Sequence, residues 1–389
     1  MGIAWPGDNC VSVHSHDVGL VPLLTEGTSG ELTGWMIFVG GGMGKNYQRE
    51  DTFPRLATPL GWVTPEDLAE TVETIITVQR DHGERGDRQR ARFKYLVHTR
   101  GEDWVRAEVE ARMGRPLGDP LPVPEWDAPD HLGWTKADDE SWVLGIPIPS
   151  GTVEDSKQLK LRSAIRLLLS EGLVAEIRIT PRQAMLLSRI APDDRDIVVS
   201  VLRDHGVQLA DDVSLLRRLA VACPALPTCG LALAESERVL PDVIEGIDKA
   251  LAQAGISGAP IRLNMTGCPN GCARPYTAEI GIVGRTKSTY DIYLGGSVGE
   301  DRMASMVRSG VKLNEIPEVL QPVLDRYATE AETGESLGDF VHRSGVVEVG
   351  TWLPAPTIRR RAGATPTGST QGSATQDVPA QDSSTLESA

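Results

Sequence analysis

The sequence has no long apolar run, and no stretch approaches the roughly 18 consecutive apolar residues that a transmembrane helix needs. Its first residues, MGIAWPGDNC, lack the basic start and the apolar stretch of a signal peptide. Positive charge is also scarce. The net charge of −15 argues against nucleic acid as the main partner, because phosphate binding needs a basic surface. These absences predict a cytoplasmic protein with neither a membrane nor a nucleic acid as its partner.

Cysteine is rare as well, with five residues in a chain of 389. Disulfides are not expected, because the cytosol keeps thiols reduced. Four of the five form two tight pairs, Cys223 with Cys229 and Cys268 with Cys272. Structural zinc usually uses C-x2-C pairs, whereas these pairs enclose five and three residues. The wider spacing favours a [4Fe–4S] cluster held by four thiolates.

The predicted elements alternate in the manner of an α+β protein. A capped helix is predicted over 64–82, starting with Thr64 as its cap and Pro65 as its first residue. Five prolines in PLGDPLPVPEWDAPD predict a linker at 116–130. The next elements, in the order strand, helix, strand, strand, helix, make up most of a ferredoxin-like unit; they are predicted at 142–148, 159–171, 174–180, 184–190 and 192–205. A helix over 235–254 then leads into a strand over 261–265.

An internal repeat divides the chain. Val18-Gly19-Leu20-Val21 aligns with Ile280-Gly281-Ile282-Val283, and each is followed by a loop, an apolar strand and a Gly-Gly-x-x-Gly turn. These turns are GGGMG (40–44) and GGSVG (295–299). Copy two follows the ferredoxin-like unit and the first cysteine pair, whereas copy one starts close to Met1. The first repeat is therefore expected to be incomplete, with well over a hundred residues missing before it.

Three further residues near the N-terminus have side chains that can bind a metal. At the repeat offset of 262 residues Cys10 falls opposite Cys272, but a lone thiol holds no cluster, so a packed or half-buried thiol is predicted. His14 and His16 would share a face on a strand, yet two ligands without a third make a poor metal site. A position in the core or at a strand edge is predicted for both histidines.

The two cysteine segments of the chain resemble those of a known family. TGCPNGCARPYTAEIGIVG (266–284) is similar to the siroheme and [4Fe–4S] signature of nitrite and sulfite reductases, and ACPALPTCGLALAESERVLP (222–241) resembles its upstream cysteine segment. The CPNGCARPY and CPALPTC forms are closer to assimilatory sulfite reductases, and the ARPY ending is closer to the ferredoxin-dependent type. The similarity runs in order over about residues 3 to 348.

The resemblance implies siroheme beside the cluster, with the thiolate of Cys272 shared between the cluster and the siroheme iron. It implies siroheme contacts at Lys94, Gln183 and Asn270. Arg182 and Ala184 depart from the asparagine-rich pattern usual beside the glutamine. The implied reaction is the six-electron reduction of sulfite to sulfide. Because no flavin or nicotinamide domain is predicted, electrons would come from a donor protein, which the resemblance implies is ferredoxin.

The implied organisation is α+β, with mixed sheets, a ferredoxin-like half-domain and a pseudo-duplicated siroheme/[4Fe–4S] domain. The predicted parts are 1–115, the rest of the first repeat; 116–132, a linker; 133–205, the ferredoxin-like half-domain; 206–350, the cofactor domain; and 355–389, a disordered tail poor in apolar residues. In the family, the residues that grip sulfite lie largely in the missing front part, so this chain by itself is expected not to turn over sulfite, and its catalytic residues stay unassigned. Nitrite reduction and a non-enzymatic electron-transfer remnant stay open as alternatives.

Overall fold

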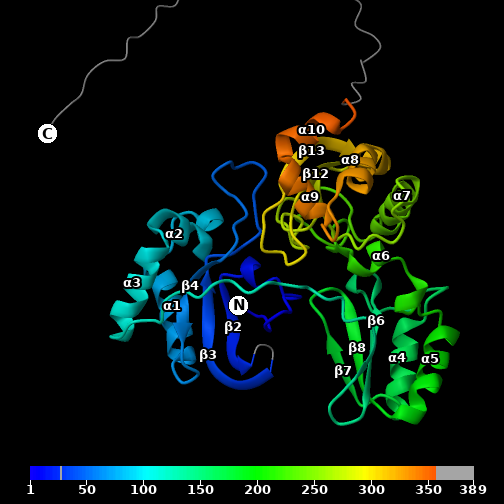
Figure 1. The fold of residues 1–389 in the computed structure, drawn as a ribbon, viewed down its shortest axis with the longest axis horizontal. Coiled ribbons are helices and arrows are strands. Elements are labelled where there is room, and N and C mark those ends of the chain that lie inside the picture. The colour runs from blue at the N-terminus through cyan, green and yellow to red at the C-terminus, as the bar shows by residue number, and fades with distance from the viewer. Residues whose placement is uncertain (27–28, 356–389) are drawn as a thin grey trace, which may run out of the picture. The chain divides into compact units, whose positions relative to one another are not determined.

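The computed structural model describes residues 1–26 and 29–355. The described part contains three sheets with helices packed on them, which confirms the predicted α+β class (Figure 1). The predicted disordered tail, apart from Ala355, lies outside the described residues. The predicted domain limits stay predictions, because Met1–Pro354 form one compact unit. Within the described residues, no helix is both long and apolar enough to span a membrane.

The first sheet holds copy one of the repeat. Its strands run in the order β1-β2-β3-β4. They are β1 (Gly2–Ile3), β2 (Val18–Glu26), β3 (Ser29–Val39) and β4 (Thr58–Val63), followed by the helices α1 (Leu68–His82), α2 (Phe93–Arg100) and α3 (Glu102–Met113). Alternate apolar residues of β2 and β3, such as Leu20 and Ile37, pack against Ile75 and Val78 of α1.

The predicted start of the first helix was wrong. The helix α1 begins at Leu68, and Thr64 does not cap it with its side chain. Thr64 instead closes a turn, because its backbone oxygen accepts a hydrogen bond from the N–H of Asp67 at 3.2 Å. This turn lies between β4 and the helix. The helix, with the apolar face that packs on the sheet, therefore begins only at Leu68.

The second sheet is the predicted ferredoxin-like unit. Its strands are all antiparallel, in the order β5-β6-β8-β7. The elements are β5 (Gly133–Lys136), β6 (Trp142–Pro147), α4 (Leu161–Ser170), β7 (Glu176–Ile179), β8 (Ala184–Ile190) and α5 (Arg195–Asp204). The predicted order of strands and helices is confirmed, and no end is shifted by more than three residues. The edge strand β5 was not predicted, since the four residues GWTK show no apolar alternation.

The third sheet holds copy two, in the order β13-β12-β11-β10-β9. Its strands are β9 (Val221–Ala222), β10 (Leu263–Thr266), β11 (Ile280–Thr286), β12 (Thr289–Leu294) and β13 (Ser305–Lys312); its helices are α6 (Leu215–Leu219), α7 (Leu240–Gln253), α8 (Ile316–Glu330), α9 (Leu337–Ser344) and α10 (Val346–Trp352). The helix predicted from 235 starts later, at Leu240, because Ser236 to Val239 form a turn. Ile247 of α7 and Leu324 of α8 belong to the same core as Ile282 and Ile292 of the sheet.

The two copies of the repeat pair their strands in the same register. Val18 lies opposite Val39 in copy one, and Ile280 lies opposite Leu294 in copy two, each followed by three more matching pairs. A parallel strand flanks each hairpin, β1 beside β2 and β10 beside β11. Gly40 and Gly295 then both take positive φ angles, 79° and 91°. The predicted duplication is therefore confirmed in three dimensions.

Candidate functional site

The four cysteines of the site follow two neighbouring strands. Cys223 comes directly after β9, and Cys268 comes two residues after β10. The two strands are parallel, with Met265 opposite Ala222, so both cysteine loops leave the same edge of the sheet. All four thiols are free. Because both loops leave this edge, the two cysteine pairs, almost forty residues apart in the sequence, come together in the fold.

Backbone hydrogen bonds tie the two loops together. The N–H of Cys223 donates to Met265 O at 3.1 Å, and the N–H groups of Leu233 and Ala234 both donate to Gly267 O, at 2.8 and 2.9 Å. The N–H of Gly267 also donates to the Cys223 sulfur at 3.3 Å. A side chain at position 267 would collide with Ala225 and Ala234. Hydrogen bonds within the protein thus hold the two loops in place without a cofactor. One backbone N–H, that of Gly267, already donates to the sulfur of Cys223, a candidate ligand.

The thiols influence one another electrostatically. Burial raises the pKa of the Cys268 thiol, and the thiols of Cys272, Cys223 and Cys229 raise this pKa further. Burial likewise raises the pKa of Cys223. Four thiolates so close together repel one another, so the deprotonated set needs a cationic metal group to balance its charge.

The four thiols do not lie at the spacing that a single zinc ion would require. Within 1–26 and 29–355, only one group of three or more ligand residues brings its ligand atoms within 4.8 Å of one another, and it contains none of these four cysteines. A tetrahedral zinc ion with sulfur at about 2.3 Å would need sulfur atoms about 3.8 Å apart. The donor set, four thiols set wider than one zinc ion requires, fits an iron–sulfur cube.

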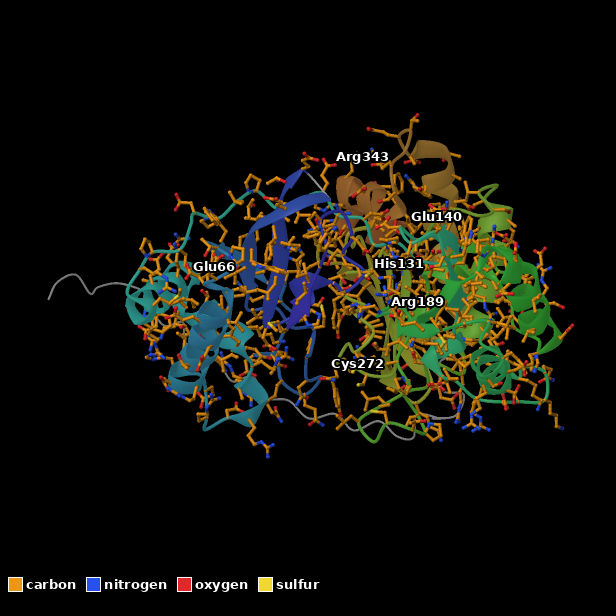
Figure 2. The ribbon with its side chains drawn as sticks, turned by 90° about the horizontal axis from the view of Figure 1, so that it is seen from below. Glu66, His131, Glu140, Arg189, Cys272 and Arg343 are labelled. Atoms are coloured by element: carbon orange, nitrogen blue, oxygen red, sulfur yellow. The ribbon has the colours of Figure 1, made fainter. Side chains whose placement is uncertain are left out.

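The C-x3-C loop meets the glycine turn of copy one. Asn270 donates from Nδ2 to the Cys272 sulfur at 3.2 Å. The N–H of Lys45 donates to Pro269 O at 3.1 Å, and Tyr276 donates its hydroxyl to the same oxygen at 2.8 Å. At Gly44, an added Cβ would lie 3.1 Å from Asn270 Oδ1. Both copies of the repeat thus contribute to the surroundings of Cys272, whose side chain is labelled in Figure 2.

Lys94, a predicted siroheme contact, supports the glycine turn in this structure. Its side chain is only 1% exposed, and Nζ donates to Gly42 O at 3.0 Å and to Gly44 O and Phe53 O at 2.5 Å. Burial lowers the pKa of Lys94 to about 8. The three carbonyl acceptors favour the ammonium form, so the side chain is charged at neutral pH. All three N–H donors are already used, and the siroheme contact stays a prediction.

Gln183 and Asn270, the other predicted siroheme contacts, both lie beside the cysteine segments. Gln183 Nε2 donates to Ala222 O at 2.6 Å, and the N–H of Ala222 donates back to Gln183 Oε1 at 3.1 Å. This double hydrogen bond fixes the residue before Cys223. Asn270 contacts the Cys272 sulfur directly, as described above. The structure brings Gln183 and Asn270 to the cysteines, whereas Lys94 bonds to the glycine turn of copy one.

A buried ionic group that no sequence pattern predicted lies beside the C-x3-C loop. Glu300 is fully buried and accepts hydrogen bonds from Arg182 at 2.8 Å, from Arg274 at 3.3 Å and from Ser12. Burial raises the pKa of Glu300, but the guanidinium groups of Arg182 and Arg274 lower it to about 2. The group joins copy one, the ferredoxin-like unit and copy two. A charged residue directly after the GGSVG turn was the only signal in the sequence.

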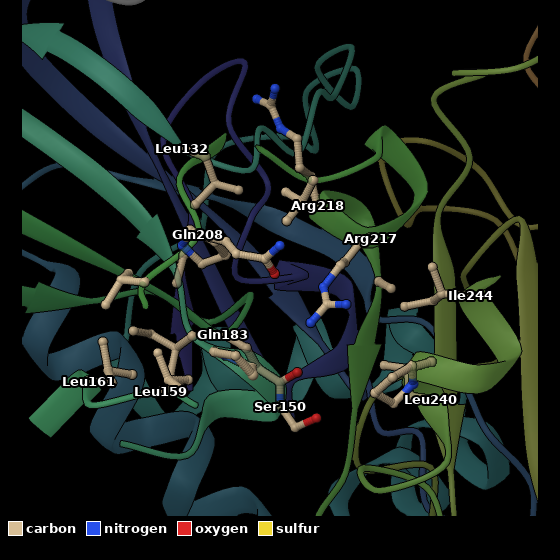
Figure 3. Close-up of a pocket in the computed structure, with 18 of the residues that line it drawn as sticks. Leu132, Ser150, Leu159, Leu161, Gln183, Gln208, Arg217, Arg218, Leu240 and Ile244 are labelled. Atoms are coloured by element: carbon tan, nitrogen blue, oxygen red, sulfur yellow. The ribbon is translucent and has the colours of Figure 1, made fainter. Parts of the chain in front are cut away.

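A cavity of about 730 Å³ lies between the ferredoxin-like unit and α6 and α7 (Figure 3). Gln183, Arg217 and Leu161 are among its lining residues, but none of the four cysteines is. Arg218, also at its wall, is paired with Asp130 at 2.7 Å. Gln183 thus lies both at the wall of this cavity and beside the residue that precedes Cys223.

The two histidines occupy structural positions. Val13–Ser15 form a single 3-10 turn rather than the expected strand. His14 is buried, contacts Ala57 O through Nδ1 at 3.2 Å and accepts a hydrogen bond from Trp126 Nε1 at 3.0 Å. His16 Nε2 lies 3.1 Å from Val11 O. Their ring nitrogens thus bond within copy one and, at His14, to Trp126 of the segment that follows it.

Comparisons with known proteins agree with this arrangement. The family model described as "Nitrite and sulphite reductase 4Fe-4S domain" matches residues 1–117 and 220–356, which are the two copies of the repeat. The sulfite reductase (NADPH) hemoprotein beta-component of Paenibacillus sp. is 38% identical over 351 residues, 90% of this chain and 61% of that protein. The sulfite reductase (ferredoxin) of Synechococcus elongatus is 39% identical over 345 residues, 89% of this chain and 55% of that protein.

A solved structure shows the same fold. The structure of Mycobacterium tuberculosis NirA protein matches with a TM-score of 0.71 and 26% identity, covering 86% of this chain and 61% of that one. The chain thus spans about 55–61% of the length of these relatives. The family and its sulfite reductase hemoproteins imply a [4Fe–4S] cluster and siroheme as cofactors, and the four free thiols fit the first of these. Matched in both copies of its repeat, the chain belongs to the nitrite and sulphite reductase 4Fe-4S family.

Proposed function

We propose that this chain forms the [4Fe–4S] and siroheme part of an assimilatory sulfite reductase that reduces sulfite to sulfide with six electrons. The single observation that carries the proposal is the exposure of Cys272. Of the four thiols at the site, Cys223, Cys229 and Cys268 are half-buried, whereas Cys272 is exposed. A thiolate that binds both the cluster and siroheme must be accessible from outside the cluster. The exposed side chain of Cys272 is accessible in this way.

The other side chains of the site would allow the Cys272 thiolate to bind both the cluster and siroheme. Three half-buried thiolates, Cys223, Cys229 and Cys268, hold the cluster, and Asn270 orients the sulfur of Cys272 by its hydrogen bond. The Gly44 position, free of a Cβ, lets a flat macrocycle approach the backbone closely. When bound, siroheme and cluster supply the electrons to the sulfur of the anion one at a time. Lys94 and the glycine turn keep this wall of the site in place.

The electron donor is proposed to be a ferredoxin in the cytoplasm. The ARPY ending after Cys272 supports this choice, and one relative is named a ferredoxin sulfite reductase. Other relatives are named NADPH-type hemoproteins. Reduced ferredoxin and an NADPH-driven flavoprotein would therefore be compared as donors, and activity with the flavoprotein alone would overturn the ferredoxin assignment.

The test of the proposal is spectroscopic and catalytic. The chain would be loaded anaerobically with iron, sulfide and siroheme. Sulfide formation from sulfite with reduced methyl viologen would be measured for this chain, which is expected not to turn over sulfite by itself, and for a version extended at its N-terminus to the length of its relatives. Cys272→Ser should change both the cluster signal and the siroheme absorption bands, whereas the control Cys10→Ser should change neither. Unaltered siroheme bands in Cys272→Ser would contradict the shared thiolate. Faster turnover of nitrite than of sulfite would replace the proposed substrate, and siroheme-free protein with a stable cluster would indicate a plain electron carrier.

A further inference from the structure

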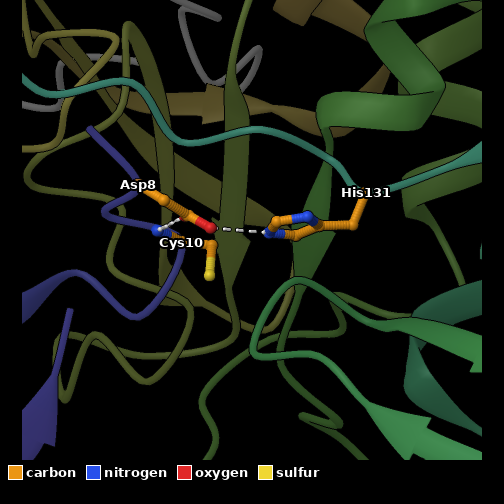
Figure 4. A group of neighbouring side chains, drawn as sticks. All are labelled: Asp8, Cys10 and His131. Atoms are coloured by element: carbon orange, nitrogen blue, oxygen red, sulfur yellow. Dashed lines mark hydrogen bonds and ion pairs between the residues drawn. The ribbon is translucent and has the colours of Figure 1, made fainter. Parts of the chain in front are cut away.

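A second group of ligand-type side chains lies away from the four cysteines. Asp8 and Cys10 come from the loop after β1, and His131 comes from the segment before β5 (Figure 4). His131 Nε2 lies 3.1 Å from Asp8 Oδ2. The carboxylate, thiol and imidazole ligand atoms all lie within 4.8 Å of one another. In the described ranges, no other trio of such side chains comes this close.

The backbone holds this group in place. The N–H of Cys10 donates to Asp8 Oδ1 at 2.9 Å, which fixes the carboxylate and thiol relative to each other. The N–H of Asn9 donates to Asp127 O at 2.7 Å, which joins this loop to the segment that carries His131. His131 itself has a φ of 57°, a left-handed conformation that is unusual for a residue other than glycine. The trio is thus assembled by the fold from two distant segments.

The position of the trio follows from the repeat. Cys10 occupies in copy one the place that Cys272 occupies in copy two, and Ser12 and Arg274 share this correspondence with φ angles of 53° and 55°. Copy one has no second cysteine in this loop, so it has no four-thiol site. Asp8 and His131 stand beside the remaining thiol instead. This loop therefore has the backbone of a metal-ligand loop and a different set of donors.

In the metal-free protein the trio contains an ion pair between the Asp8 carboxylate and the His131 imidazole. Hydrogen bonds with Asp8 and then with Cys10 raise the pKa of His131 to about 10. Burial raises the pKa of Asp8, but its hydrogen bonds with His131 and Cys10 lower it below its usual value. Without metal, the proton on the imidazole balances the carboxylate. A divalent ion would replace this proton and the thiol proton, and both would be released.

We propose that Asp8, Cys10 and His131 bind one Zn²⁺ ion, with water as the fourth ligand. One thiolate, one imidazole and one carboxylate are all ligands that zinc accepts, and three protein ligands with an open position are a common zinc arrangement. His131 Nε2 and Asp8 Oδ2, 3.1 Å apart, already lie at about the spacing of two ligands around a tetrahedral ion, and the Cys10 sulfur lies within 4.8 Å of both. The bound ion joins the Asp8–Cys10 loop to the segment before β5, and so stabilises the contact between copy one and the ferredoxin-like unit.

The test measures zinc in cluster-loaded protein, so that the four cluster thiols are occupied by iron. Protein incubated with ZnSO4 and desalted should keep about one zinc per chain. Cys10→Ser and His131→Gln should each lose this zinc without losing iron. The control is His82→Gln, because His82 pairs with Glu108 at 3.3 Å in a histidine–carboxylate pair that is not among the close trios. Its zinc content should equal that of the wild type.

X-ray absorption at the zinc edge provides the second measurement. One sulfur and three nitrogen or oxygen neighbours are expected around zinc. Four sulfur neighbours would place the ion at the cluster cysteines and overturn the proposal. Absence of zinc from wild-type protein, or equal zinc in wild type, Cys10→Ser and His131→Gln, would overturn it as well. Iron content and siroheme spectra report on the proposed function separately, so the two proposals fail independently.

Discussion

Asn270 donates a hydrogen bond from Nδ2 to the sulfur of Cys272, the one exposed thiol of the four. The same asparagine faces Gly44, so the amide lies between the ligand loop of copy two and the glycine turn of copy one. A hydrogen bond to a thiolate lowers its negative charge density and favours the reduced, more negative cluster. We therefore propose that Asn270 tunes the proposed cluster through this hydrogen bond.

Replacing Asn270 should lower the reduction potential of the cluster. In Asn270→Leu the bond to Cys272 is lost, and a differential stabilisation of about 1 kcal/mol corresponds to roughly 40 mV for one electron. A redox titration followed by electron paramagnetic resonance measures this shift. Asn46→Leu is the control, because Asn46 donates to Gln89 on the surface at 3.0 Å. Equal potentials in Asn270→Leu and wild type would show that the bond has no electronic role.

Loss of a half-buried cysteine should abolish the cluster. Anaerobically reconstituted wild-type protein should hold about four iron atoms in the cube. Cys223→Ser and Cys229→Ser should each lose the cluster signal, since a three-thiol site leaves one iron atom without its ligand. Cys10→Ser should retain all the iron. Iron retained by Cys223→Ser, or lost from Cys10→Ser, would contradict the assignment of the four ligands.

Local chemistry was predictable from the sequence, whereas long-range partners were not. The spacing of Cys268 and Cys272 is a local property, and the structure places the loop that carries them against the one that carries Cys223. The repeat was also readable, because a strand, a loop, a second strand and a glycine turn recur in the same order. The partners of Lys94 and Glu300 depend on how separate elements pack. No pattern near Asp8 points to His131, which lies on another segment altogether.

The role of Lys94 can be separated from the predicted siroheme contact. Lys94→Met should lower the free energy of unfolding by about 2 to 3 kcal/mol, because three backbone carbonyls lose their donor. Urea denaturation of cofactor-free protein measures this loss. Lys249→Met is the control, since Lys249 makes an exposed pair with Glu245 and should cost under about 0.5 kcal/mol. Unchanged stability together with weaker siroheme binding would instead favour the direct contact.

Glu300 should be a main support of the contact between the three parts of the chain. In Glu300→Gln the buried Arg182 and the half-buried Arg274 lose their counter-charge, and unfolding should become easier by about 3 kcal/mol. The pKa of Glu300 is lowered to about 2, so its contribution is present above about pH 4.5 and is lost as the pH falls through about 2. The stability difference between wild type and variant should therefore shrink in acid. A difference that stays constant from pH 6 to pH 3 would contradict this account.

The pair of His131 and Asp8 should give the zinc-free protein a pH dependence of the opposite sign. The pKa of His131 is raised to about 10, above its unfolded value of about 6.5, so the folded state holds a proton that the unfolded state releases. The stabilisation is fully present below about pH 6.5 and is lost as the pH rises towards 10. Stability measured by urea denaturation should thus fall more steeply between pH 7 and pH 9 in the wild type than in His131→Gln. Asp8→Asn should remove the same slope, because the carboxylate is the main cause of the raised pKa. Parallel pH profiles for the wild type and both variants would mean that the imidazole is not held as a cation, and would remove the electrostatic support for a metal ion at this place.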